Sequence, residues 1–457
     1  MSDKNLEMAR RIAYLVDEHG GTAYFVGGYV RDKIRHEDNK DIDIEVHGIY
    51  PRQLESILDA LGERILIGES FGIYNLKGYT LDIAMPRKED NRGSGHRDFD
   101  ICVDPFIGTY KAALRRDFTI NALLEEILTG KVIDHFGGLE DLDNGIIRHI
   151  NDATFAEDPL RVLRAAQFAA RFNYTIAEET LELCRRMDLS SLSKERVMGE
   201  VEKALLKSEK PSVFFESLRQ MNQLSAWFPE LEDTIGVKQN PRHHAEGDVW
   251  THTMMVVDAA VKYRDEVSNP LGFMLSAVTH DFGKAICTEI VNGQIHAYNH
   301  ETAGLPLVES FMTRLTAEKA LIEYVMNMSE LHMRPNVMAA NNSAIKSTNK
   351  LFDQSVEPEA LACLALSDDI GKIPPQEDGS HADFFAKRLE VFREYMSRPY
   401  VMGRDLITAG MVPSERFSEY LEYAHKLRLA GVKKDDALRQ TLAMARKKGD
   451  YERIDKK

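Results

Sequence analysis

The fold of the first part of this chain is decided by the stretch Phe25-Val26-Gly27-Gly28-Tyr29-Val30-Arg31-Asp32, followed closely by Asp41-Ile42-Asp43-Ile44-Glu45-Val46. The apolar residues before the two glycines predict a buried strand, and a helical pattern begins after them. Glycine lets the backbone turn tightly and approach an anion closely. The strand, turn and helix together therefore predict a phosphate-binding cradle.

The second piece alternates acidic and apolar residues with the period of a strand. Its apolar residues are predicted to face the core, and Asp41, Asp43 and Glu45 then share the other face. Carboxylate pairs bind Mg²⁺, and two ions about 3.5 to 4 Å apart can stabilise the attacking and leaving oxygens of a nucleotidyl transfer. A solvated strand face is the alternative, but the glycine turn favours the metal site. Asp82 could be a third carboxylate of this site or an edge-strand charge.

The composition predicts a multidomain protein of the cytoplasm. The 457 residues exceed the roughly 100 to 200 of an ordinary domain. No apolar run has the length of a membrane span, and the first residues lack the apolar core of a secretory signal. The four cysteines are far apart, which fits a reducing compartment. The net charge of -15 argues against indiscriminate coating of nucleic acid, so any RNA must be held locally.

The patterns that follow predict an α/β palm and then a mainly helical chain. We expect a helix at 5–19, a short helix at 53–61 and strands at 64–67, 73–76 and 79–85. The polar, glycine-containing segment 86–100 predicts a mobile loop beside the site. Beyond about residue 150 glycines become sparse and helical patterns dominate.

Two further charged motifs indicate nucleotide binding. In the segment 114–122, Arg116 offers a guanidinium for a triphosphate and Asp117 a carboxylate for a ribose hydroxyl, although a solvated basic turn is the alternative. Asp158 then stands at the cap position of a strong helix. Asp158, Arg161 and Arg164 recur every three residues on the polar face of that helix.

The row from Asp158 to Arg164 suggests how a protein could choose its nucleotide. Cytosine and adenine both present an amino donor beside a ring-nitrogen acceptor, so one carboxylate and one guanidinium can pair with either base. Uracil and guanine present the donor and the acceptor in the opposite order. The row therefore predicts selection of CTP and ATP by side chains alone.

The second half of the chain holds a separate constellation of metal-ligand residue types. A His-Asp pair is expected about once by chance in such a chain, so the dipeptide alone is weak evidence and its structural context is the stronger evidence. Each residue of the constellation lies in or at the end of a segment predicted as an apolar helix. Nitrogen and oxygen ligands of this kind suit Mg²⁺ or a divalent transition metal for hydrolysis. His300 and His332 could complete a second metal position, or be surface histidines. The four ligands predicted are His252, His280, Asp281 and Asp368.

Taken in order, the motifs resemble those of the class II tRNA nucleotidyltransferase and bacterial poly(A) polymerase family. The resemblance covers about the first half of the chain and implies a CCA-adding enzyme. Gln167 departs from it, since many members carry another arginine there. The matching motifs are 27–32, 41–43, 115–122 and 157–164. The roles implied are Mg²⁺ binding for Asp41 and Asp43, nucleotide binding for Gly28, Arg31, Arg116 and Arg164, ribose binding for Asp117, and base recognition for Asp158 and Arg161.

The second constellation resembles the HD phosphohydrolase domain, which some bacterial tRNA nucleotidyltransferases carry at this point. The two resemblances imply an α/β nucleotidyltransferase palm, an all-α neck and body, an all-α HD domain and a helical tail. The boundaries expected are 1–150, 151–235, 236–375 and 376–457.

We therefore expect template-independent addition of CCA to the 3′ end of tRNA from CTP and ATP, with Mg²⁺ in the palm. The HD domain is expected to hydrolyse a 2′,3′-cyclic phosphate or 2′-phosphate with Ni²⁺, Co²⁺, Mn²⁺ or Mg²⁺. No membrane partner is expected, and the protein would be a monomer or homodimer. The alternatives are an A-adding enzyme, a poly(A) polymerase, or an HD phosphohydrolase whose palm only binds RNA.

Overall fold

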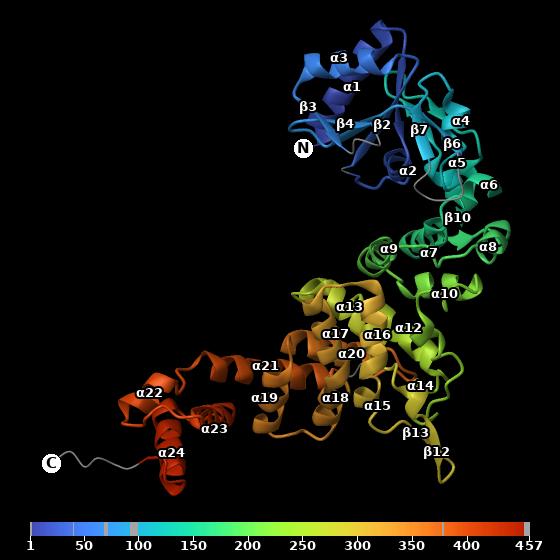
Figure 1. Ribbon diagram of the computed structural model, residues 1–457. Coiled ribbons are helices and arrows are strands. Elements are labelled where there is room, and N and C mark those ends of the chain that lie inside the picture. The colour runs from blue at the N-terminus through green and yellow to red at the C-terminus, as the bar shows by residue number, and fades with distance from the viewer. Residues whose placement is uncertain (1, 40, 68–71, 92–98, 377–378, 452–457) are drawn as a thin grey trace. The chain divides into compact units, whose positions relative to one another are not determined.

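The computed structural model describes residues 2–39, 41–67, 72–91, 99–376 and 379–451 (Figure 1). The chain divides into two compact units, Met1–Ser193 with Val213–Gln223, and Lys194–Ser212 with Leu224–Lys457. The predicted neck and body at 151–235 contributes to both units, and the finer division into four domains stays a prediction. Among the described residues, no helix combines the length and hydrophobicity needed to cross a membrane.

The first unit is built on a seven-stranded mixed sheet with strand order β3-β4-β5-β2-β1-β8-β9. Strand β2 lies at its centre, antiparallel to β1 and parallel to β5. Helices α1 (Ser2–Glu18) and α3 (Pro51–Leu61) pack on each other, and α1 also packs on β1 and β2. The strands are β1 (Thr22–Val26), β2 (Ile42–His47), β3 (Arg64–Ile67), β4 (Ile73–Leu76), β5 (Leu81–Ala84), β8 (Leu124–Glu126) and β9 (Val132–Ile133). The predicted α/β palm is thus present.

The prediction of an irregular loop at 86–100 is wrong for its two ends. Strands β6 (Arg87–Asn91) and β7 (Phe99–Val103) form an antiparallel pair, with Arg87 opposite Val103 and Asn91 opposite Phe99. Apolar residues at every second position of β7 are the signal of a strand, and the charges before them obscured it. Residues 92–98, the middle of the predicted loop, lie outside the described part of the chain.

Helices complete the first unit after the sheet. Helix α7 buries most of its apolar residues and ends at Asn173, whose left-handed φ of 56° is tolerated by asparagine. A short parallel strand pair, β10 (Ile146–Ile147) with β11 (Thr175–Ile176), connects the segment before α6 with the segment after α7. The remaining elements are α2 (Gly28–Ile34), α4 (Thr109–Ala113), a 3-10 turn (Thr119–Asn121), α5 (Gly138–Asn144), α6 (Asp152–Ala156), α7 (Leu160–Phe172), α8 (Glu178–Cys184) and α10 (Ser212–Gln220).

The second unit is mainly helical and is organised around α13 (Pro270–Thr279). Every residue from Gly272 to Thr279 is buried, as expected for a helix that is apolar on all sides. It packs against α9 (Lys194–Lys207), α12 (Val249–Ala260), α17 (Lys319–Leu331) and α20 (Pro358–Ile370). The other helices are α11 (Pro229–Glu232), α14 (Lys284–Cys287), α15 (His300–Ala303), α16 (Leu305–Leu315), α18 (Met333–Ala340), α19 (Ile345–Gln354), α21 (Ser380–Ser397), α22 (Gly403–Thr408), α23 (Phe417–Leu429) and α24 (Lys434–Lys447).

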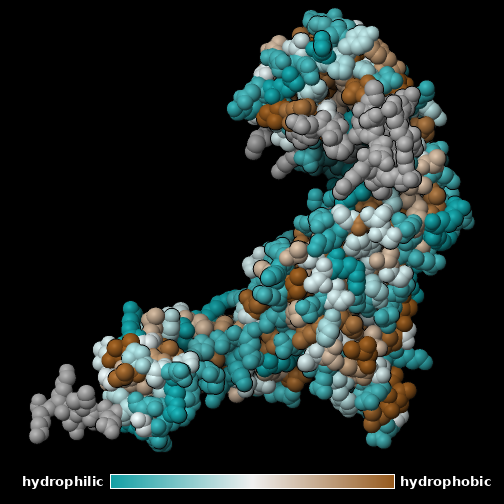
Figure 2. Space-filling view, in the orientation of Figure 1, coloured by the Kyte–Doolittle hydropathy of each residue, from teal (hydrophilic) through white to brown (hydrophobic). Residues whose placement is uncertain are grey.

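A hairpin interrupts the segment that the sequence predicts as wholly helical. Strands β12 (Glu289–Val291) and β13 (Gln294–His296) are joined by Asn292 and Gly293, both with positive φ, which is the usual chemistry of a two-residue hairpin turn. Ile290 and Val291 at this hairpin are exposed, and Figure 2 shows apolar side chains gathered there on an otherwise largely hydrophilic surface.

Candidate functional site

The glycine turn between β1 and α2 has the backbone shape that its residues predict. Gly27 has φ 67° and ψ -132°, a conformation that L side chains rarely adopt. A Cβ atom at Gly27 would also lie 2.9 Å from Nη1 of Arg116 and 3.7 Å from Oδ2 of Asp43. The missing side chain therefore lets one guanidinium and one carboxylate approach the turn.

Three carboxylates gather on one face of the sheet beside this turn. Strand β2 alternates as predicted, with its apolar residues buried while Asp41 and Asp43 face the other way. Asp82 on β5 pairs in parallel register with Asp43, so both side chains project from the same face. Burial raises the pKa of Asp43 to about 6; the Arg116 guanidinium opposes the rise, and the charges of Asp82 and Asp41 add to it. Carboxylates that repel one another in this way fit a divalent cation.

Arg116 is held beside these carboxylates by an ion pair that the sequence motifs did not predict. Oε2 of Glu45, on the same strand face, lies 3.4 Å from Nη2 of Arg116. His47 contacts the other oxygen of Glu45 at 2.8 Å. Arg116 also donates from Nη1 to the carbonyl of Asn121 at 3.3 Å. The Arg116 side chain is 23% exposed, so a further partner can reach it.

Arg31 and Asp117 belong to a buried hydrogen-bond network. Arg31 is only 3% exposed and donates to Asp32 at 2.7 Å and to Oδ1 of Asn121 at 2.6 Å. The amide of Asn121 donates to Asp117 at 2.9 Å, and Nε of Arg164 donates to Asp117 at 2.7 Å. Although burial acts in the opposite direction, Arg164 and Asn121 hold the pKa of Asp117 below its usual value. This network ties the palm to α7, and Asn121 is its central residue.

The predicted base-reading residues lie at the beginning of α7. Oδ1 of Asp158 accepts from the backbone N–H of Leu160 at 3.1 Å. The cap position of α7 is Pro159, one residue after the predicted Asp158, because the regular helix begins only at Leu160. Arg161 donates to the carbonyls of Thr154 and Arg115 at 2.5 and 2.7 Å, so its guanidinium is fixed in place. Gln167 is 1% exposed and its Nε2 atom has no hydrogen bond, so it lies in the core rather than on the polar face.

The second unit brings the four predicted ligands of the other constellation together. His252 comes from α12, His280 and Asp281 follow α13, and Asp368 lies on α20. Nε2 of His252 lies 3.0 Å from Asp368 and 3.6 Å from Asp281, and Nε2 of His280 lies 3.3 Å from Asp281. His252, His280 and Asp281 are all buried.

His300 and His332 join the same cluster, which excludes the alternative that they are surface histidines. They are 4% and 2% exposed, and their Nε2 atoms lie 3.1 and 3.6 Å from Oδ1 of Asp281. The Nδ1 atoms of His280, His300 and His332 lie 2.9, 2.8 and 2.6 Å from the carbonyls of the residues three positions earlier. Such contacts occupy Nδ1 and leave Nε2 facing the cluster, the arrangement found in metal-binding histidines.

Several possible metal-ligand atoms of the cluster are buried, and their close contacts within the protein lack hydrogen-bond geometry. These buried atoms are Nε2 of His252, Nε2 of His280 and both oxygens of Asp281. The Lys284 ammonium lies 2.6 Å from Asp281 and, against the effect of burial, contributes with His280 to hold the pKa of Asp281 well below its usual value. An ionised carboxylate surrounded by imidazole acceptors fits a divalent metal.

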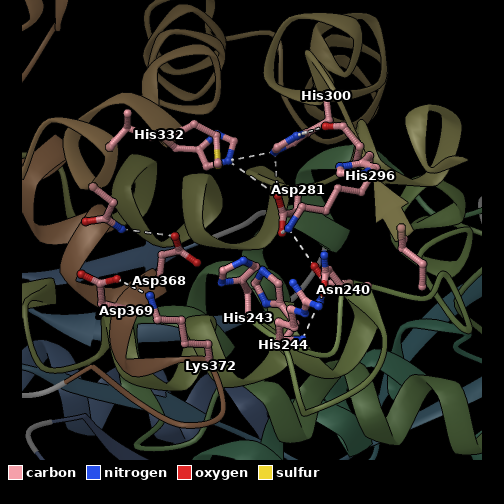
Figure 3. Close-up of a pocket in the computed structure, with 18 of the residues that line it drawn as sticks. Asn240, His243, His244, Asp281, His296, His300, His332, Asp368, Asp369 and Lys372 are labelled. Carbon is pink, nitrogen blue, oxygen red and sulfur yellow. Dashed lines mark hydrogen bonds and ion pairs between the residues drawn. The ribbon is translucent and has the colours of Figure 1, made fainter. Parts of the chain in front are cut away.

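Sequence reasoning gave no role to Glu246, which supports this cluster from outside. Oε1 of Glu246 lies 3.1 Å from Nδ1 of His252 and 2.7 Å from Nδ1 of His244. Glu246 lies two residues after His244, and this spacing was a possible sequence signal for their contact. A cavity of about 690 Å³ opens over the cluster, with His244, Asp281, His300, His332 and Asp368 among its lining residues (Figure 3).

Comparison with family models matches two parts of the chain. Residues 23–148 match the poly A polymerase head domain, and residues 173–235 match the probable RNA and SrmB-binding site of polymerase A. The first range contains the glycine turn and the strand with Asp41 and Asp43.

Curated relatives cover most of the chain. A multifunctional CCA protein of Haemophilus ducreyi is 34% identical over 340 residues, which span 72% of this chain and 79% of that protein. One from Pasteurella multocida is 34% identical over 401 residues, spanning 85% and 91%.

Solved structures share the fold at lower identity. A Thermotoga maritima CCA-adding enzyme complexed with tRNA matches with a TM-score of 0.64 and 21% identity, covering 96% of this chain and 95% of that one. A CCA-adding enzyme complexed with CTP matches with a TM-score of 0.67 and 20% identity, covering 98% and 96%.

Proposed function

This chain belongs to the family of class II CCA-adding enzymes, and we propose that it adds C, C and A to the 3′ end of tRNA from CTP and ATP. The observation that carries the proposal is the carboxylate face of β2. Asp41 and Asp43 stand beside a glycine turn and the partly exposed side chain of Arg116, with Asp82 next to them. Relatives in the same family are described as multifunctional CCA proteins.

Each residue of the palm site has a distinct task in this reaction. Asp41 and Asp43 would hold Mg²⁺, which supplies activation of the 3′ hydroxyl and stabilisation of the departing pyrophosphate. Arg116 is placed to pair with the triphosphate because its guanidinium is partly exposed beside Asp43. Gly27 and Gly28 leave room for a phosphate to approach the backbone.

We assign nucleotide selection to Asp158 and Arg161. Backbone carbonyls already fix two nitrogens of the Arg161 guanidinium, so the side chain can present its remaining donors in one orientation. A rigid donor beside a carboxylate matches the edge that cytosine and adenine share. Replacing Arg161 by Ala should therefore let UTP and GTP be incorporated.

Three tRNA substrates separate this function from its alternatives within the family. A tRNA lacking CCA, one ending in CC and one ending in CCA are each supplied with labelled CTP or ATP. A CCA-adding enzyme extends the first with both nucleotides, the second with ATP alone, and the third not at all. Growth of the CC-ending tRNA alone would indicate an A-adding enzyme, and long tails on the complete tRNA would indicate a poly(A) polymerase.

A second activity is favoured by the buried cluster of the other unit. We propose that His252, His280, Asp281 and Asp368 form the metal centre of an HD phosphohydrolase, with His300 and His332 serving a second metal position. A divalent metal held there would supply a water of lowered pKa for hydrolysis. Opening a 2′,3′-cyclic phosphate at its P–O3′ bond returns the 3′ hydroxyl that the palm must extend and leaves a 2′-phosphate for a second hydrolysis.

The test of this activity uses 2′,3′-cyclic AMP with Ni²⁺, Co²⁺, Mn²⁺ and Mg²⁺ in turn. The His280→Ala and Asp281→Ala variants should lose hydrolysis and bound metal, yet still add CCA to an intact tRNA. If the wild-type protein hydrolyses nothing that these changes abolish, the second activity is refuted and the first is unaffected.

A further inference from the structure

The cavity over the histidine cluster is larger than the cluster itself requires. Its volume of about 690 Å³ lies within the roughly 300 to 1,000 Å³ typical of pockets that enclose a whole small-molecule ligand. In Figure 3, His300 and His332 lie on one side of Asp281, whereas Asn240, His243 and His244 lie on the other. The cavity therefore has room for a substrate that extends well beyond the phosphate that reacts.

Two positively charged residues of the cavity lining have no anionic partner among the described residues. All three of its aspartates have partners within the protein, whereas Lys238 and Arg242, which are exposed, have neither a hydrogen bond to the side chain nor an ion pair among the described residues. Two exposed cations at the same cavity are free to bind an external anion, which a chain with a net charge of -15 can hold only at a local basic site. The internal pairs are Asp281 with Lys284, Asp368 with His252, and Asp369 with both Lys372 and His381, at 2.6 to 3.0 Å.

One face of α18 provides an apolar surface in the same cavity. Met333, Val337 and Ala340 recur at helical spacing and all line it, and Val337 is 53% exposed. Between them Asn336 donates to Asp368 at 3.3 Å and to the carbonyl of Ala365 at 2.9 Å, so this face is tied directly to the proposed metal centre. Exposed apolar side chains in this cavity suit a flat, weakly polar group such as a nucleobase.

We propose that this cavity binds the 3′ end of an RNA strand in preference to a free nucleotide, an inference that rests on the proposed phosphohydrolase activity. The terminal base lies on the α18 face and the reacting phosphate lies at Asp281. The phosphate of the preceding linkage is held by Lys238 and Arg242. A mononucleotide has no such linkage, so these two cations distinguish the polymer from the monomer.

The experiment compares two substrates that differ only in the preceding linkages. They are 2′,3′-cyclic AMP and a short oligoribonucleotide ending in a 2′,3′-cyclic phosphate. The full-length wild-type protein is compared with a Lys238→Ala, Arg242→Ala double variant. The matched control is a Lys346→Ala, Lys350→Ala double variant, because these exposed lysines of α19 do not line the cavity. KM, kcat and bound metal are measured for each protein, and KM is measured at several salt concentrations.

The expected result is a selective change in KM. Loss of two charge-assisted phosphate contacts should raise KM for the oligonucleotide about tenfold or more, with kcat, bound metal and KM for the cyclic mononucleotide within about twofold of wild type. The KM of the wild-type protein for the oligonucleotide should also rise more steeply with salt than that of the double variant. The control variant should match wild type throughout.

Two kinds of outcome would overturn the inference and can be told apart. If the double variant changes both substrates equally, changes neither, or loses metal, the cations do not recognise a second phosphate, and the phosphohydrolase proposal stands. If wild type hydrolyses neither substrate with any of the four metals, the phosphohydrolase proposal fails and this inference fails with it.

Discussion

The two proposed sites are built in opposite ways. In the palm, the acidic residues lie on neighbouring strands, and Asp41 is exposed. In the second unit, His252 on α12, Asp281 just after α13 and Asp368 on α20 converge in a largely buried cluster lined by imidazoles. An open carboxylate face suits Mg²⁺ that is shared with a nucleotide, whereas a buried nitrogen-rich cluster suits a resident transition metal. The difference teaches that the two proposed sites would favour different metal ions and so would not compete for the same one.

The largest expected effect is the loss of CCA addition when the palm carboxylates are removed, and it would separate the two sites most clearly. Replacing Asp41 and Asp43 by Ala should lower CCA addition by roughly 10³-fold or more, since metal stabilisation of the transition state contributes several kcal/mol. Hydrolysis of 2′,3′-cyclic AMP should not change. Steady-state assays of both reactions, with circular dichroism as the folding control, make the test. Retained addition by the folded double variant would contradict the assignment.

The next effect concerns the histidines on the far side of Asp281. Replacing His300 and His332 by Ala removes two nitrogen ligands, so hydrolysis should fall about 100-fold and bound metal should decrease, whereas addition should be unchanged. His425→Ala is the matched control, because this histidine is partly exposed and pairs with Asp353 outside the cavity. Metal analysis of the purified proteins gives the readout. An unchanged metal content would leave the cluster with a single metal position.

These two sites also differ in how far the sequence could predict them. Asp41 and Asp43 are two residues apart on one strand, so period-two alternation was sufficient to place them on one face. The position of Asp82 could not be predicted, because it depends on β5 pairing with β2. The Glu45 contact with Arg116 joins residues 71 apart in the chain, and no local pattern encodes it.

The second unit repeats this lesson. The motif residues His280 and Asp281 were recognisable, but the burial of His300 and His332 depends on how α13, α15 and α17 pack. The predicted helical class holds for most of the unit. The hairpin at β12 and β13 was missed because its strands are only three residues long, too short for a clear period.

A smaller effect would test how Arg116 is positioned. Glu45→Gln removes the negative charge that lies 3.4 Å from the Arg116 guanidinium and holds it in place. KM for CTP and ATP should therefore rise about fivefold to tenfold, with little change in hydrolysis of 2′,3′-cyclic AMP. Glu63→Gln is the control, because the Glu63–Lys77 pair is exposed and should contribute little. Equal nucleotide KM values in wild type and Glu45→Gln would show that Arg116 needs no such support.

The smallest effect should appear in the stability of the second unit. Glu230 is buried, and despite the opposing effect of burial, hydrogen bonds from Arg314 and Ser310 lower its pKa. A carboxyl with a lowered pKa stabilises the fold above its unfolded pKa, and this contribution is lost as the pH falls through the folded value. Glu230→Gln should therefore cost about 2 kcal/mol at pH 7 and progressively less below about pH 4.

Denaturant unfolding of wild type and Glu230→Gln at pH 7 and at low pH measures this difference. Hydrolysis should be inactivated at a lower temperature in the variant, while addition, which depends on the other unit, should retain its wild-type profile. A stability difference that grew as the pH fell would contradict the assigned pKa direction.

The central claim is that this protein adds one CCA to tRNA without any contribution from the histidine cluster, and sequencing the product of a single reaction tests it most directly. A tRNA lacking CCA is incubated with all four nucleoside triphosphates and either wild type or a His280→Ala, Asp281→Ala double variant. We predict that both proteins add one CCA and stop, with no U or G incorporated. Addition of A alone, a long A tail, or loss of extension in the folded double variant would contradict the claim.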